Sequence, residues 1–103
     1  MAGEGIRALT IPKLGMTMKE GKVARWLVSE GAAVKAGDPV VDIETEKITS
    51  ECEAPATGVL RRRVAQEGAV LPVGGLVAVI APANLPDRDI DAFVAAFKPE
   101  QEV

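Results

Sequence analysis

The fold of this chain is decided by the run Val40-Val41-Asp42-Ile43-Glu44-Thr45-Glu46-Lys47-Ile48-Thr49-Ser50-Glu51-Cys52-Glu53-Ala54. On both sides of Lys47, apolar or small residues alternate with acidic or polar residues. A period of two indicates β-strands that have one buried face and one solvated face. The run therefore predicts two antiparallel strands joined by a tight turn at Glu46-Lys47, with the lysine at its apex.

The predicted turn lacks the residues that normally favour a two-residue hairpin. Such turns need positive φ and select Asn-Gly or Asp-Gly, whereas this chain has Glu46-Lys47. A non-glycine residue held at positive φ costs about 1–3 kcal/mol, and such residues cluster at functional sites. We therefore interpret the tip as selected for its lysine. The alternative is that Lys47 is an ordinary solvated lysine, as most lysines are.

Composition excludes several classes of function. With 103 residues and 3% aromatic content, this is one small domain with a core of Val, Ile, Leu and Ala. A net charge of −3 argues against nucleic acid or an anionic membrane as partner. One cysteine and no histidine exclude an internal disulfide, a metal cluster and a Ser-His or Cys-His catalytic pair. The first residues resemble no signal peptide and no apolar run spans a membrane, so a cytoplasmic protein is expected.

An internal repeat surrounds the hairpin. The segment 21–32 aligns without a gap to 58–69, and at the same offset Val40 and Ile43 align with Val77 and Ile80. Further strands are expected at 8–11, 23–28, 33–35 and 59–65. Two copies with one apolar face each predict face-to-face stacking about an approximate two-fold axis. This arrangement places Lys47 at one end of the molecule and both chain ends at the other.

Three other features leave alternatives open. The run 61–63 of three arginines is interpreted as a solvated strand face, with a docking patch for an acidic partner as the less favoured alternative. Cys52 is expected in the core, with its thiol pKa raised by Glu51 and Glu53. The loop 13–21 either fills the end of the core with its leucine and methionines or presents them to a partner.

The C-terminal residues have the pattern of a helix. Ile90, Phe93, Val94 and Phe97 recur at helical spacing after an acidic entry at 87–89. A helix of about three turns is marginal alone. It must therefore pack on the strands, on another copy of the chain or on a further domain.

Over residues 7–82 the chain resembles a lipoyl domain. The resemblance is carried by three separated motifs in the family's order, at 11–21, 42–48 and 53–58. It implies an all-β fold, a flattened barrel or sandwich of two four-stranded antiparallel sheets with quasi-two-fold symmetry, plus a short C-terminal helix. Residues 1–6 are then a lead-in, and 83–103 an amphipathic helix or linker towards a possible further domain.

By the same resemblance, Lys47 carries lipoate in amide linkage. The recognition residues expected around it are Glu44, Thr45, Glu46, Ile48 and Glu51, together with Leu14, Met16 and Thr17 of the neighbouring loop. Glu46 departs from the aspartate that most often precedes the lysine in the family. No catalytic residue and no metal ligand are expected.

The resemblance implies a carrier that is part of an acyltransferase component and has no enzyme activity of its own. Lipoyl-Lys47 would move an acyl group, expected to be acetyl, from a thiamine-diphosphate dehydrogenase component to coenzyme A at an acyltransferase catalytic domain. An FAD-dependent dihydrolipoyl dehydrogenase would reoxidise it, and a lipoate ligase or transferase would attach it. The loop 14–18, the segment 60–62 and the tail 89–94 resemble acetoin dehydrogenase acyltransferases, while pyruvate and branched-chain 2-oxo acid complexes remain alternatives.

Three other functions use a related fold. A biotinyl domain usually has its lysine between two methionines, whereas Lys47 lies between Glu46 and Ile48, which favours lipoate. A glycine-cleavage carrier is a weaker alternative. An unmodified structural or adaptor module is the third, with the apolar stripe of the helix as a dimer contact.

Overall fold

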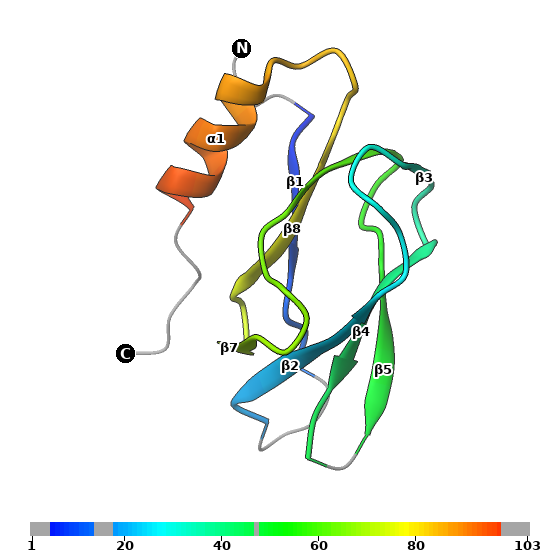
Figure 1. Cartoon of the computed structure of the whole chain (residues 1–103), viewed down its shortest axis with the longest axis vertical. Coiled ribbons are helices and arrows are strands. Elements are labelled where there is room, and N and C mark those ends of the chain that lie inside the picture. Colours follow the sequence, from blue (N-terminus) through cyan, green and yellow to red (C-terminus); the bar gives the residue numbers. More distant parts are fainter. Residues whose placement is uncertain (1–4, 14–17, 47, 98–103) are drawn as a thin grey trace.

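Two four-stranded antiparallel sheets stack face to face in the computed structural model, which describes residues 5–13, 18–46 and 48–97 (Figure 1). One sheet has the strand order β1-β8-β6-β3 and the other β5-β4-β2-β7. The elements are β1 (Arg7–Thr10), β2 (Glu20–Trp26), β3 (Ala33–Val34), β4 (Pro39–Glu44), β5 (Thr49–Glu53), β6 (Gly58–Arg63), β7 (Val70–Pro72), β8 (Leu76–Ala81) and the helix α1 (Asp87–Ala96). The predicted all-β class with a short C-terminal helix is confirmed, as a sandwich whose sheets do not close into a barrel.

The repeat in the sequence is a repeat in the structure. β2, β3 and β4 of one half occupy the same sheet positions as β6, β7 and β8 of the other. The two halves exchange equivalent hydrogen bonds, because the Gly31 N–H donates to the Leu60 carbonyl at 2.7 Å and the Gly68 N–H to the Val23 carbonyl at 2.7 Å. Both glycines have φ 93°, a conformation that side chains other than glycine rarely adopt. The predicted quasi-two-fold symmetry is therefore confirmed.

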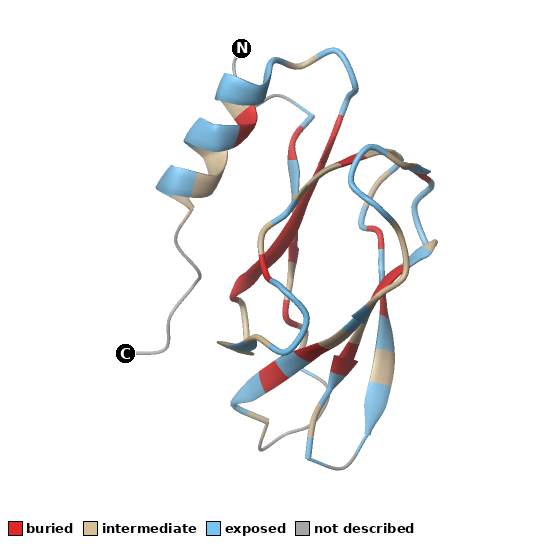
Figure 2. Cartoon of the chain, in the orientation of Figure 1, coloured by how far each residue is buried: buried red, intermediate tan, exposed pale blue. Residues whose placement is uncertain are grey.

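The core between the sheets is built from equivalent aliphatic residues of the two halves. Val23 and Leu60 are both fully buried, as are Ile43 and Ile80. β8 is buried along its whole length (Figure 2), because one face meets this core and the other meets α1. Among the described residues, the largest fully buried side chains are all aliphatic.

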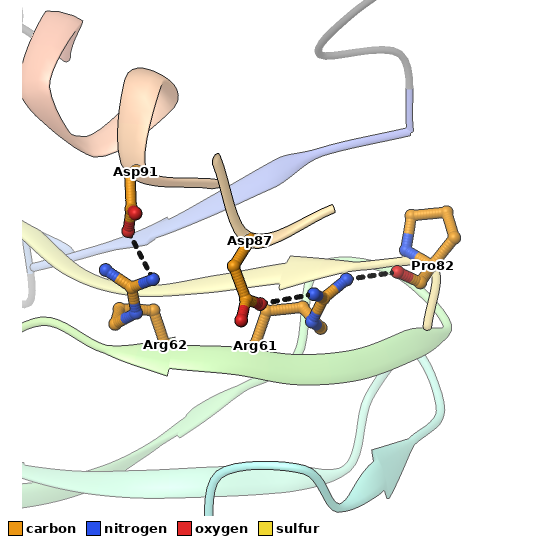
Figure 3. Close-up of polar contacts among 5 residues, drawn as sticks. All are labelled: Arg61, Arg62, Pro82, Asp87 and Asp91. Atoms are coloured by element: carbon orange, nitrogen blue, oxygen red, sulfur yellow. Dashed lines mark hydrogen bonds and ion pairs between the residues drawn. The ribbon is translucent and has the colours of Figure 1, made fainter. Parts of the chain in front are cut away.

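A β-bulge at the same place in each half changes which side chains face outward. The pairing of β6 with β8 shifts between Leu60 and Arg62, and that of β2 with β4 shifts between Val23 and Arg25. A bulge leaves one extra residue unpaired and re-aims the side chains around it. As a result, Arg61 and Arg62 both point out of the sheet towards α1 (Figure 3).

The two arginines hold the helix instead of facing solvent alone. The Arg61 guanidinium donates to the Pro82 carbonyl at 2.7 Å and to the Asp87 carboxylate at 2.8 Å. The Arg62 guanidinium pairs with the Asp91 carboxylate. The interpretation of this run as a solvated face or an acidic-partner patch is therefore wrong for both residues.

Helix α1 packs on the outer face of the sheet that contains β8. Its only buried residue is Ile90, which is fully enclosed in a second apolar cluster with Ile6, Leu76, Val79 and Ala81. Phe93 and Val94 pack at the edge of the same cluster. The predicted helix is confirmed, and of the three partners considered for its apolar stripe the structure shows the chain's own sheet. Within the described residues, no helix has the length and apolar character needed to cross a membrane.

Different elements lie at the two ends of the sandwich. The β4–β5 hairpin forms one end, and the start of β1, the end of β8 and the start of α1 lie at the other (Figure 1). This separation follows from the two-fold arrangement, in which the hairpin of one half corresponds to the open end of the other.

Candidate functional site

The β4–β5 hairpin is shorter in its strands and longer in its tip than the alternation predicts. β4 ends at Glu44 and β5 begins at Thr49, and these two residues are paired. The tip therefore comprises residues 45–48. The Thr45 N–H donates to the Ile48 carbonyl at 2.7 Å, which brings the two ends of the tip together.

The Thr45 side chain adds two further hydrogen bonds between the same two residues. Its hydroxyl donates to the Ile48 carbonyl at 3.2 Å and accepts from the Ile48 N–H at 3.2 Å. No non-glycine residue in the described part of the chain has positive φ. The predicted positive φ is therefore wrong for Glu46, which lies in a tip whose ends are joined by the Thr45 side chain. Lys47 itself lies outside the described residues.

The surroundings of the tip are open and acidic. Glu44, Glu46 and Glu51 are exposed, Thr45 is half-buried and Ile48 is 47% exposed. Glu44 faces outward because its neighbour Ile43 on β4 is fully buried, and Glu51 faces outward because its neighbour Cys52 on β5 is buried. The predicted recognition residues around Lys47 that the structure describes thus lie together at one end of the molecule.

Two cations on β2 lie next to the acidic strands. Arg25 makes an ion pair with Asp42 at 3.6 Å, and Lys22 is the cross-strand partner of Glu44. The Arg25 side chain is largely exposed, so this pair contributes little to stability. The acidic charge at the tip, beyond Glu44, has no such neighbour on β2 in the described pairing.

The loop between β1 and β2 is described only at its two ends. The predicted recognition residues Leu14, Met16 and Thr17 lie outside the described residues. Met18, at the end of the loop, packs half-buried against the core. A Cβ added at Gly21 would come within 2.8 Å of Ile43 Cγ2, so the backbone of β2 lies directly against β4 here. Of the two interpretations of the loop, Met18 fits the one in which it fills the end of the core.

Cys52 is a core residue and not a nucleophile. Burial first, and then the charges of Asp42 and Glu53, raise the pKa of its thiol from 9.0 to about 11. The prediction of a core position with a raised pKa is confirmed, but Asp42 contributes where Glu51 was expected. Asp42 stands on β4 beside Val41, the residue that pairs with Cys52.

A surface cleft on the quasi-two-fold axis is held by its own residues. The Glu67 carboxylate accepts from the backbone N–H of Trp26 at 3.1 Å, and the equivalent Glu30 carboxylate accepts from the backbone N–H of Arg63 at 2.7 Å. The Arg63 guanidinium lies 5.6 Å from the centre of the Trp26 ring. This pair of carboxylates was not predicted from the sequence, although the repeat aligns the two glutamates. These two glutamates join the two halves of the repeat. Among the described residues, no group of three or more His, Cys, Asp or Glu side chains could hold a metal ion.

The hairpin suits a group attached to Lys47 in amide linkage. Such a group needs no cavity, but it needs a lysine that a modifying enzyme and later partners can reach. The residues on either side of Lys47, Glu46 and Ile48, are both exposed. The described surroundings of the lysine therefore fit a carboxylic acid cofactor joined to its side-chain amine.

Comparison with known proteins gives one family. The model of a biotin/lipoyl family, described as "Biotin-requiring enzyme", matches residues 7–80. The chain is 51% identical over 90 residues to the dihydrolipoyllysine-residue acetyltransferase component of the acetoin cleaving system of Cupriavidus necator, covering 87% of this chain and 24% of that protein. It is 42% identical over 88 residues to the corresponding component of the pyruvate dehydrogenase complex of Rickettsia conorii, covering 84% of this chain and 21% of that protein. The chain thus spans about a quarter of the length of these curated relatives.

A solved structure agrees with the sequence comparison. The lipoyl domain of the 2-oxoglutarate dehydrogenase complex from Azotobacter vinelandii superposes with a TM-score of 0.57 at 34% identity. The match covers 72% of this chain and 96% of that domain.

Proposed function

Since this chain belongs to the biotin/lipoyl family and is a lipoyl domain, we propose that Lys47 carries lipoate in amide linkage. The observation that carries the proposal is that the two sequence neighbours of Lys47, Glu46 and Ile48, are both exposed in the connection between β4 and β5. The chain is then a carrier module of a longer acyltransferase component, without an active site of its own.

The attached group supplies the chemistry, and the protein supplies position and recognition. Lipoate provides a dithiolane that can accept an acyl group, release it to coenzyme A and be reoxidised by thiol–disulfide exchange. The side chain of Lys47 adds its flexible stem to the length of this group, which makes a swinging arm. Tethering in a multidomain protein holds such an arm near its partners at an effective concentration on the order of mM.

The residues around Lys47 have separate roles in this proposal. The sandwich holds the hairpin at the end opposite the start of β1 and the start of α1 (Figure 1). Glu44, Glu46 and Glu51 mark the tip with negative charge, which steers partners that carry a basic surface. Ile48 adds an exposed apolar contact. The recognition set is completed by Leu14, Met16 and Thr17 of the loop before β2.

The complex served is proposed to be an acetoin dehydrogenase complex, with acetyl as the acyl group. The support is the 51% identity to the Cupriavidus necator acetyltransferase component, against 42% to the pyruvate dehydrogenase component of Rickettsia conorii. The partners are then a lipoate-attaching ligase or transferase, a thiamine-diphosphate dehydrogenase component, an acyltransferase domain that uses coenzyme A and an FAD-dependent dihydrolipoyl dehydrogenase. The compartment that holds such a complex is proposed to be the cytoplasm.

The folded unit is proposed to extend beyond residue 82. Sequence analysis expected 83–103 to be a helix or linker, yet α1 buries Ile90 and is tied to β6 through Arg61 and Arg62. We therefore propose that the folded unit includes the residues up to Phe97.

Intact mass tests the attachment. The domain is incubated with a lipoate ligase, lipoate and ATP, beside Lys47→Ala and the matched control Lys22→Ala, which removes an exposed lysine paired with Glu44 on the neighbouring strand. The parent and the Lys22 variant should gain one lipoyl group and the Lys47 variant none. A folded parent that stays unmodified, or a Lys47 variant that is modified, would overturn the proposal. The biotinyl and adaptor functions would then be the alternatives to test.

A further inference from the structure

We propose that Thr45 is a positioning residue for the modification of Lys47, acting through its hydroxyl. The inference rests on the proposed attachment at Lys47 and assigns the work of presenting that lysine to one described side chain. Thr45 touches neither the cofactor nor the ligase in this proposal. It sets the distance between the two ends of the tip.

Three hydrogen bonds join Thr45 to Ile48. One is the bond from the Thr45 N–H to the Ile48 carbonyl at 2.7 Å, and the other two are made by the Thr45 hydroxyl at 3.2 Å each. A hydroxyl can serve both groups because it carries one donor hydrogen and two acceptor lone pairs. Since only two residues separate Thr45 from Ile48, these bonds fix both ends of the short segment that contains Lys47.

The tip needs these hydrogen bonds because Glu46-Lys47 contains no residue that favours a tight turn. A Glu-Lys tip has neither the glycine nor the asparagine that closes most two-residue hairpins. Glu44 and Glu46, which precede the lysine in the sequence, add two exposed like charges. The last regular pair of the hairpin joins Glu44 to Thr49, so beyond it the Thr45–Ile48 bonds are the fixed points that the structure describes.

Threonine is suited to this position by its stiffness as well as by its hydroxyl. A β-branched side chain has a restricted χ1 torsion, so little freedom is lost when the hydroxyl is held against Ile48. A tip that is already closed spares the ligase the cost of ordering it on binding. The expected consequence of removing the hydroxyl is a slower modification of a domain that is otherwise folded.

The test compares Thr45→Val, Thr45→Ser and Thr49→Val. Valine keeps the branched shape and the backbone bond but removes the hydroxyl, whereas serine keeps the hydroxyl and loses the methyl group. Thr49→Val is the matched control, because Thr49 is an exposed threonine on the same hairpin outside the Thr45–Ile48 closure. Each domain is assayed for lipoate transfer by a lipoate ligase with ATP, and its melting temperature is recorded.

Thr45→Val should lower kcat/KM for lipoate transfer by about tenfold, the effect expected from losing roughly one well-made hydrogen bond in the productive complex. Thr45→Ser should restore most of the rate, and Thr49→Val should match the parent. If the parent is lipoylated and Thr45→Val is lipoylated at the same rate, the role of Thr45 is overturned and the attachment at Lys47 stands. Failure of serine to restore the rate would also overturn it, since packing and not the hydroxyl would then be responsible. A parent that is never modified would remove the proposed attachment and this role with it.

Discussion

Replacing Ile90 by alanine tests whether helix α1 belongs to the folded domain. Ile90 is fully buried, with no exposed surface, and stands in a cluster with Leu76 and Val79 of β8. Truncation of a buried isoleucine to alanine typically lowers the free energy of unfolding by about 2–5 kcal/mol. A domain of this size has only about 5–15 kcal/mol in total, so the loss is measurable in a urea titration.

The expected cost has an upper limit set by the helix itself. An isolated helix of about three turns is marginal in water, so α1 is folded mainly because it is docked. If the cavity costs more than docking contributes, the helix detaches and the loss stops at the docking free energy. We therefore expect a loss of about 2–4 kcal/mol, towards the lower part of the usual range.

Two probes separate detachment from global unfolding. Trp26 packs against the core between the sheets, not against the helix cluster, so its fluorescence follows the sandwich. Far-UV circular dichroism follows α1. Ile48→Ala is the matched control, because the same change at a residue that is 47% exposed should cost less than about 1 kcal/mol. An Ile90 variant no less stable than the Ile48 variant would refute the reasoning and return α1 to the status of a linker.

The remaining predictions concern charge. Arg61→Ala should cost about 1–2 kcal/mol, because its nearly buried guanidinium serves the Pro82 carbonyl, whereas Asp87→Asn should cost at most about 0.5 kcal/mol at a largely exposed carboxylate; equal losses in urea titrations would contradict this order. Glu30→Ala should cost about 1 kcal/mol through the lost acceptor for a backbone N–H, with Glu30→Gln milder, and calorimetry that ranks glutamine as the worse change would be incompatible with an acceptor role. The raised thiol pKa of Cys52 predicts stability that is intact below about pH 9 and declines as the pH rises towards about 11, because the unfolded thiol loses its proton first. Cys52→Ala should remove this alkaline decline, and a variant with the same pH profile of unfolding would show that another group is responsible.

Much of the fold was predictable because its signals are local or repeated. Alternation around the tip gave β4 and β5, and the gap-free repeat gave the two-fold arrangement. β8 has no alternation, since it is buried on both faces, and only the match of Val77 and Ile80 to the first half pointed to it. The helix was predictable from the spacing of Ile90 and Phe93, but its partner was not.

The missed features depend on contacts between distant residues. A bulge in β6 turns Arg61 and Arg62 to the same side, whereas simple alternation places neighbouring residues on opposite faces. The closure of the tip by Thr45 was hidden for a related reason, because a threonine at the end of a strand pattern looks like an ordinary β-former. Alternation pointed to Lys47 at the tip, but its role came from the resemblance to lipoyl domains, because composition and periodicity do not contain it.

Acylation of the lipoylated domain tests the carrier function most directly. The lipoylated parent and the unmodified parent are each incubated with a thiamine-diphosphate acetoin dehydrogenase component and acetoin, and the intact mass is followed, with free lipoamide as a parallel acceptor. The account predicts one acetyl group on the lipoylated domain, none on the unmodified domain and a much slower reaction with free lipoamide. A lipoylated, folded domain that stays unacylated while free lipoamide reacts would contradict the account.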